Sequence, residues 1–193
     1  MSRALFLFPS NRMVPSILAG LCLLTTACAT FHQETCAQFE ERRKETDYNT
    51  LYRFSDSDSE TAASNFKQLT RGRSAAVRLY KMQLDTPTIK TCNHLVIHKE
   101  IYLQRTANKK LVLEEVREFY TGDGTLIASK TESIGNQLRT TGYYTGNTLL
   151  PIPENAPPGN YRIVSKLVLK GKNKSQRVLL AKASASFQVV ARK

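Results

Sequence analysis

Residues 157–190 run PPGNYRIVSKLVLKGKNKSQRVLLAKASASFQVV. Apolar side chains recur here with a period of two. They are Tyr161, Ile163, Leu167 and Leu169 in the first half, and Leu179, Ala181, Ala183, Ala185, Phe187 and Val189 in the second. Polar residues occupy the alternate positions, and the segment 171–174 is a polar turn. This alternation predicts a β-hairpin with one buried face and one face in water.

The same period extends toward the N-terminus. It predicts strands over 95–104, 111–120, 126–131, 138–144 and 148–152. The sequence Thr121-Gly122-Asp123-Gly124 predicts a hairpin turn. Six or seven short strands with frequent turns indicate a mainly β, antiparallel sandwich.

One part of this pattern resembles a known fold family. The sequence Pro157-Pro158-Gly159-Asn160-Tyr161 and the ending Phe187-Gln188-Val189 are similar to the closing half of bacterial immunoglobulin-like or fibronectin-type domains. The resemblance covers roughly residues 90–191. It implies an immunoglobulin-like β-sandwich in which Tyr161 acts as a tyrosine corner. It implies no function, since this fold has many unrelated roles.

The segment before residue 91 is more polar. Residues 33–53 have the pattern of a polar helix, and the acidic, Ser-rich residues 55–60 indicate a linker whose end can also start a helix at Ser57. Residues 77–84 fit a helical turn or a strand, and Thr86-Pro87 ends this element, so the role of residues 75–90 stays open. We therefore expect a short N-terminal helical segment and three regions: 1–27 as a signal peptide, 28–90 as a tether, and 91–193 as the sandwich.

The N-terminus has a basic start and a short apolar run from Met13 to Leu24. The following residues, Leu24 to Cys28, resemble the bacterial lipobox. This resemblance implies a lipid on Cys28, and Ala29 after it implies anchoring in the outer membrane, facing the periplasm. An alternative is cleavage at Ala27-Cys28-Ala29, which gives a soluble periplasmic protein that starts at Thr30.

Two cysteines, Cys36 and Cys92, remain outside the signal peptide and the lipidation site. An even number of cysteines in an oxidising compartment predicts a disulfide. This bond stabilises the fold by about 4 kcal/mol on the chain-entropy model.

The full chain has a formal net charge of +12. Export argues against nucleic acid as a partner, so an envelope protein or an anionic envelope component is expected instead. A candidate surface for an anionic partner consists of Arg162, Lys166, Lys170, Lys172 and Lys174. The alternative is that these lysines protect a strand edge from aggregation.

No catalytic motif is present in the sequence. His94, His98 and Glu100 share one strand face, but the two histidines are about 13 Å apart on an extended strand, too far for one metal ion. We expect no catalytic residues, no metal and no cofactor. The predicted function is a non-enzymatic binding or assembly module attached to the membrane through its lipid. The alternative is a protease inhibitor that uses segment 142–147 or 153–160.

Overall fold

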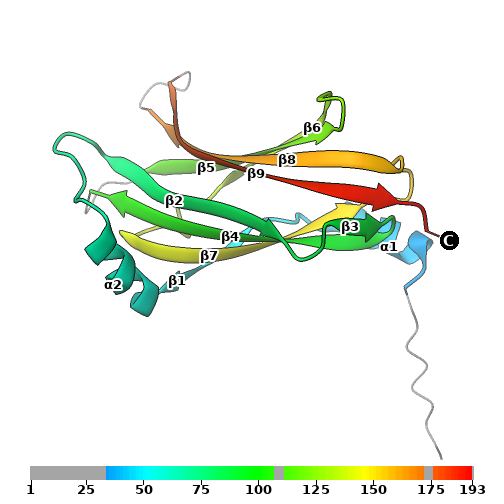
Figure 1. Ribbon diagram of the computed structural model, residues 1–193, viewed down its shortest axis with the longest axis horizontal. Coiled ribbons are helices and arrows are strands. Elements are labelled where there is room, and N and C mark those ends of the chain that lie inside the picture. Colours follow the sequence, from blue (N-terminus) through cyan, green and yellow to red (C-terminus); the bar gives the residue numbers. More distant parts are fainter. Residues whose placement is uncertain (1–33, 107–110, 172–175, 193) are drawn as a thin grey trace, which may run out of the picture. The chain divides into compact units, whose positions relative to one another are not determined.

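The computed structural model describes residues 34–106, 111–171 and 176–192, which form a β-sandwich (Figure 1). The first sheet has the strand order β1–β7–β4–β2, and the second has the order β3–β9–β8–β5–β6. The first sheet comprises β1 (Leu51–Ser55), β2 (Ala75–Leu84), β4 (Asn93–Arg105) and β7 (Gly142–Ile152). The second comprises β3 (Thr88–Lys90), β5 (Val112–Thr121), β6 (Leu126–Ser133), β8 (Gly159–Lys170) and β9 (Arg177–Val190). The predicted fold class is confirmed, with one parallel pair, β3 and β9, among antiparallel neighbours.

The hairpin β8–β9 follows the predicted alternation. Tyr161 pairs with Phe187, and their rings stack on the inner side of the second sheet with centroids 5.5 Å apart. The Tyr161 hydroxyl donates to the carbonyl of Pro157 at 2.6 Å, which is the kind of bond that the tyrosine-corner resemblance implied. Leu179 departs from the prediction: a register shift after Leu167 turns it outward, and it is 56% exposed.

The expected boundary at residue 91 needs correction. Strands β1, β2 and β3 all come from the range 28–90, and they complete both sheets. β2 forms one edge of the first sheet and pairs with β4 along most of its length. The reason is tertiary: Tyr52, Ala75, Ala76 and Met82 all precede residue 91 and are buried in the sandwich core.

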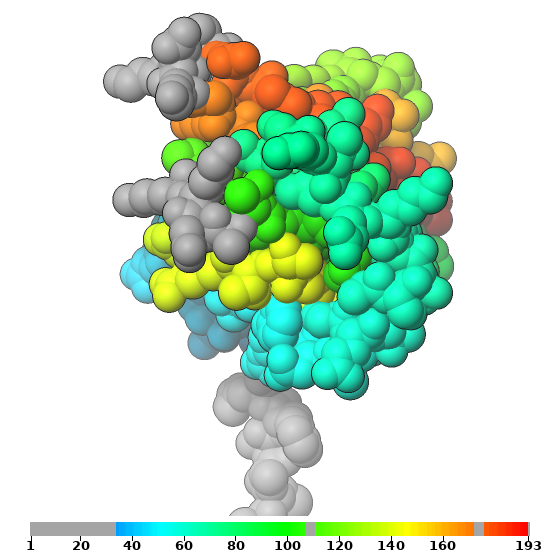
Figure 2. Space-filling view, turned by 90° about the vertical axis from the view of Figure 1, so that its left-hand side faces the viewer, coloured from blue at the N-terminus to red at the C-terminus, as the bar shows by residue number. Residues whose placement is uncertain are grey.

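The two helices are short. α1 (Cys36–Glu45) starts with a capping box between Thr35 and Gln38. α2 (Asp56–Asn65) occupies most of the segment expected to be a linker; Ser55 caps it, two residues before the predicted start. The Ser59 hydroxyl of α2 accepts from the backbone N–H of Tyr143 at 2.7 Å, so α2 lies beside β7 (Figure 2). No helix among the described residues is long and apolar enough to cross a membrane.

The predicted disulfide between Cys36 and Cys92 is present. It joins the start of α1 to the turn between β3 and β4, with Cα atoms 5.2 Å apart. Phe39 of α1 is almost fully buried and packs on the His94 ring. The N-terminal segment is thus fixed to one end of the sandwich by a covalent bond and by apolar contact. Cys28 and the predicted signal peptide, residues 1–27, lie outside the described residues.

Candidate functional site

An ion pair between Lys99 and Glu115 crosses the core between the two sheets. Lys99 belongs to β4 and Glu115 to β5, and both side chains are 0% exposed. A buried charge is costly unless it is paired and hydrogen-bonded. The surrounding groups therefore decide what this pair does.

Hydroxyl groups surround the Lys99–Glu115 pair. The Lys99 ammonium donates to Thr50 at 2.9 Å and to Thr148 at 3.0 Å. The Glu115 carboxylate accepts from Thr50 at 2.9 Å and from Tyr52 at 3.0 Å, and it also accepts from Ser165. Each charge has several partners, as a buried network requires.

A second ion pair lies next to the first. Glu132 of β6 pairs with Glu115 in register, and its carboxylate accepts from Arg117 at 2.8 Å. The same carboxylate accepts from the backbone N–H of Thr50, and Arg117 also donates to the carbonyl of Tyr48. The buried charge network, defined as Lys99, Glu115, Arg117 and Glu132, thus has two cations and two anions. It binds the segment before β1 to both sheets.

The pKa directions follow from this geometry. Burial opposes ionisation of Glu115, but Lys99 and the hydrogen bonds outweigh that cost and lower the pKa of the carboxyl. Burial dominates at Glu132 and raises its pKa, and burial lowers the pKa of the Lys99 ammonium. Because the side chains of Lys99 and Glu115 have no exposed surface, a dissolved ligand does not touch them. Their role in this conformation is to hold the sheets and the N-terminal segment together.

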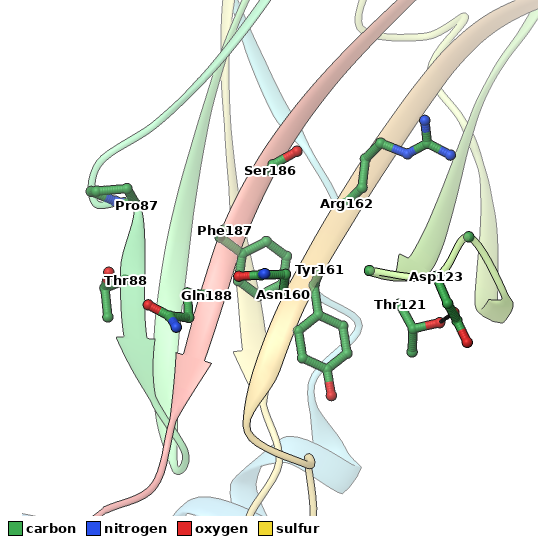
Figure 3. A pocket seen from close by; sticks show the side chains of 12 residues that line it. Pro87, Thr88, Thr121, Asp123, Asn160, Tyr161, Arg162, Ser186, Phe187 and Gln188 are labelled. Atoms are coloured by element: carbon green, nitrogen blue, oxygen red, sulfur yellow. Dashed lines mark hydrogen bonds between the residues drawn. The ribbon is translucent and has the colours of Figure 1, made fainter.

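A solvent-accessible site lies on the outer face of the second sheet. Figure 3 shows Asn160 and Arg162 of β8 beside Ser186 and Gln188 of β9, with Thr88 and Asp123 at the sides. These residues line a hollow of about 590 Å³, called the polar hollow below, to which Pro87, Tyr161 and Phe187 also contribute. The strand register places Arg162 opposite Ser186 and Asn160 opposite Gln188. Side-chain amides, hydroxyls, one carboxylate and one guanidinium therefore face a shared space.

Arg162 carries the free positive charge of the polar hollow. Its guanidinium lies over the ring of Tyr120, 5.1 Å from the centroid. Within the described part of the chain it has no carboxylate partner. Asp123, by contrast, accepts from Thr121 and from the backbone N–H of Thr125, and these bonds lower its pKa.

Two other members of the predicted anionic-partner surface, Lys166 and Lys170, are paired with carboxylates. Lys166 forms an ion pair with Glu118 at 2.6 Å, and Lys170 forms one with Glu114 at 2.5 Å. Both carboxylates belong to β5, so the neighbouring strand offsets much of the positive charge of β8. Lys172 and Lys174 lie outside the described residues. Arg162 is the member that the structure leaves available to an anion.

The two histidines of the described residues, His94 and His98, do not converge on a metal site. His94 lies against Phe39 and Tyr48, while the ring of His98 bonds to Asn147 at 2.8 Å. Glu100 accepts instead from the hydroxyl of Tyr143. Among the described residues, the one cluster with ligand-like spacing contains Cys36 and Cys92, whose sulfur atoms form the disulfide, and Glu154.

The sequence pattern did not lead us to predict the buried charge network, although one residue in it, Lys99, indicated a buried charge. Lys99 falls on the apolar face of its strand, between Ile97 and Ile101. Glu115 gives no such signal, because residues 111–120 carry charges on both faces. Glu114 and Glu118 lie on the face of β5 opposite to Glu115 and pair with lysines of β8, and Glu114 is itself only 7% exposed.

No protein-family model and no curated protein matches this chain. Several solved structures are similar in fold. The C-terminal domain of Wzt is 10% identical, with a TM-score of 0.46 over 75% of this chain and 80% of that one. The CARDB domain of the PF1109 protein from Pyrococcus furiosus, solved with di-metal ions, is 13% identical, with a TM-score of 0.37 over 64% of this chain and all of that one. At these identities the similarity concerns the fold alone.

Proposed function

We propose that this protein is a non-enzymatic binding module of the bacterial envelope, held on the periplasmic side of the outer membrane by a lipid on Cys28. Its ligand is an acidic polysaccharide, bound in the polar hollow. The observation that carries the proposal is the guanidinium of Arg162, which has no carboxylate partner among the described residues, at a hollow whose lining includes side-chain amides and hydroxyls.

The chemistry of the polar hollow favours a sugar that bears an anionic group. Asn160, Gln188 and Ser186 offer both donors and acceptors, which suits the many hydroxyls of a sugar. Arg162 offers a charge-assisted hydrogen bond to a carboxylate or a sulfate. Asp123 accepts hydroxyl protons on the other side of the hollow.

The test uses the full chain in envelope vesicles and a panel of acidic and neutral polysaccharides. We expect Arg162→Gln to weaken binding of the acidic polysaccharides about tenfold, since a hydrogen bond to a charged group is worth about 1.5–3 kcal/mol. The matched control is Lys166→Gln, which makes the same change of charge on the same face at a lysine already paired with Glu118. Equal binding by wild type and Arg162→Gln would refute the proposal.

Protease inhibition is less well supported by the geometry. Segment 142–147 lies within β7 rather than in a loop. Segment 153–160 contains a turn closed by a bond from the Ala156 N–H to the Pro153 carbonyl. A substrate-like loop needs an extended backbone, so we retain the binding module as the proposed function.

A further inference from the structure

A second hollow, the apolar cleft, opens between the two sheets. It has a volume of about 550 Å³, within the range typical of small-molecule sites. Its apolar lining comes from both sheets: Phe119, Ile127, Leu150, Ile152, Phe187 and Val189. The polar hollow and the apolar cleft share four lining residues, Thr121, Tyr161, Arg162 and Phe187.

The strand pairing explains why the apolar cleft is open. β1 pairs with residues 143–147 of β7 only, so the C-terminal part of β7 has no neighbour on that side. β6 is the edge of the second sheet, and a register shift at Phe119 and Tyr120 leaves Ile127 without a partner in β5. Ile127 is 54% exposed at this place. Apolar surface that is exposed next to a cleft indicates a binding site.

The residues at the rim of the apolar cleft favour a hydrocarbon chain over a peptide strand as the ligand. Pro151, Pro153 and Pro157 lie on it, and proline has no N–H to donate. A peptide strand needs such donors for its carbonyls, whereas a hydrocarbon chain needs none. The free positive charge at the border comes from Arg162, which has no carboxylate partner among the described residues, whereas Arg43 is paired with Glu40.

We propose that the apolar cleft binds the hydrocarbon chain of a long-chain carboxylate, with its headgroup at Arg162. Apolar burial drives the binding, and the guanidinium selects the anionic head over a neutral one. Affinity then rises by about fourfold for each methylene added, until the cleft is filled. This inference adds a second ligand class and does not depend on polysaccharide binding.

The test uses a palmitic acid with a photoreactive diazirine, added to envelope vesicles that contain the full chain. After illumination, mass spectrometry locates the adducts. We expect adducts on the peptides that carry Ile127 and Leu150, and we expect unlabelled palmitate to suppress them more strongly than hexadecanol does. Adducts confined to other regions would overturn the proposal. So would labelling that an apolar peptide removes and palmitate does not.

A matched pair of variants separates the apolar cleft from its surroundings. Ile127→Glu places a carboxylate in the lining, and Leu126→Glu makes the same change at a neighbour that is 52% exposed and does not line the cleft. We expect Ile127→Glu to reduce labelling about tenfold and Leu126→Glu to leave it within about twofold. Equal labelling of the two variants would refute the site. Polysaccharide binding by Ile127→Glu should be unchanged, so failure of this proposal and failure of the proposed function are distinguishable.

Discussion

Lys99 and Glu115 form an ion pair in the centre of the sandwich, and neither side chain has any exposed surface. Lys99 comes from the first sheet and Glu115 from the second. The hydroxyls of Thr50, Thr148 and Ser165 complete their hydrogen bonds. The contact between the sheets is therefore ionic at this point, where most β-sandwiches are apolar.

Removing one partner of this pair should destabilise the protein strongly. Lys99→Met leaves the Glu115 carboxylate buried without its cation, which costs about 3–5 kcal/mol. Urea unfolding followed by circular dichroism measures the loss. The control is the double variant Lys99→Met/Glu115→Leu, which we expect to lose less than Lys99→Met because no unpaired charge remains. A single variant as stable as wild type would contradict this account.

The same pair predicts a loss of stability in acid. The pKa of Glu115 falls from its ordinary value of 4.5 to about 2 in the folded protein. The ionised form of Glu115 therefore stabilises the fold at neutral pH. This contribution is lost as the pH falls from the ordinary pKa of 4.5 to the folded-state pKa of about 2. Glu132 acts in the opposite direction, since burial raises its pKa and protonation then favours the fold.

Unfolding free energies between about pH 5 and about pH 2 check the acid prediction. The wild type should lose more stability across this range than Lys99→Met/Glu115→Leu, which lacks the titrating carboxyl. Parallel pH profiles of the two proteins would show that Glu115 does not contribute.

Loss of the disulfide should weaken the attachment of α1. Replacing Cys36 and Cys92 together by Ala removes a cross-link that spans 56 positions, at a cost of about 4 kcal/mol on the chain-entropy model. Hydrogen exchange should rise first in α1, because Phe39 and the disulfide fix it to the sandwich. Uniform exchange across the domain would indicate that α1 is held by other contacts.

A side chain at Gly146 should destabilise the protein. A Cβ atom there would lie 2.5 Å from the ring of Tyr52, whose hydroxyl donates to Glu115. We expect Gly146→Ala to reduce the unfolding free energy by about 1–3 kcal/mol through overpacking. Thr145→Ala, at the adjacent exposed position, is the control and should change it by less than about 0.5 kcal/mol.

Mass spectrometry of the mature N-terminus tests the predicted anchor. Lipidation gives a chain that starts at Cys28 and carries the mass of attached acyl groups, and Cys28→Ser should abolish both the modification and retention in the membrane. An unmodified wild-type chain that starts at Thr30 would instead show a soluble periplasmic protein.

The sheet arrangement was more predictable than the site. The hairpin β8–β9 and the disulfide followed from local alternation and from cysteine arithmetic. The role of residues 51–90 did not, because β1, β2 and β3 gain their stability from pairing with distant strands. The start of helix α2 was placed two residues late, because its acidic, Ser-rich composition suits a linker as well as the first turn of a helix.

By itself, the amino-acid sequence determined that the chain folds as a β-sandwich, since a period of two needs only neighbouring residues to define a buried face. The tertiary structure alone decided which charges are free. Lys166 and Lys170 are neutralised by carboxylates of β5, while Arg162 is not, and Lys99 meets Glu115 only when the two sheets pack. The physical reason is that charge pairing acts through space, between strands whose register is set by the whole fold.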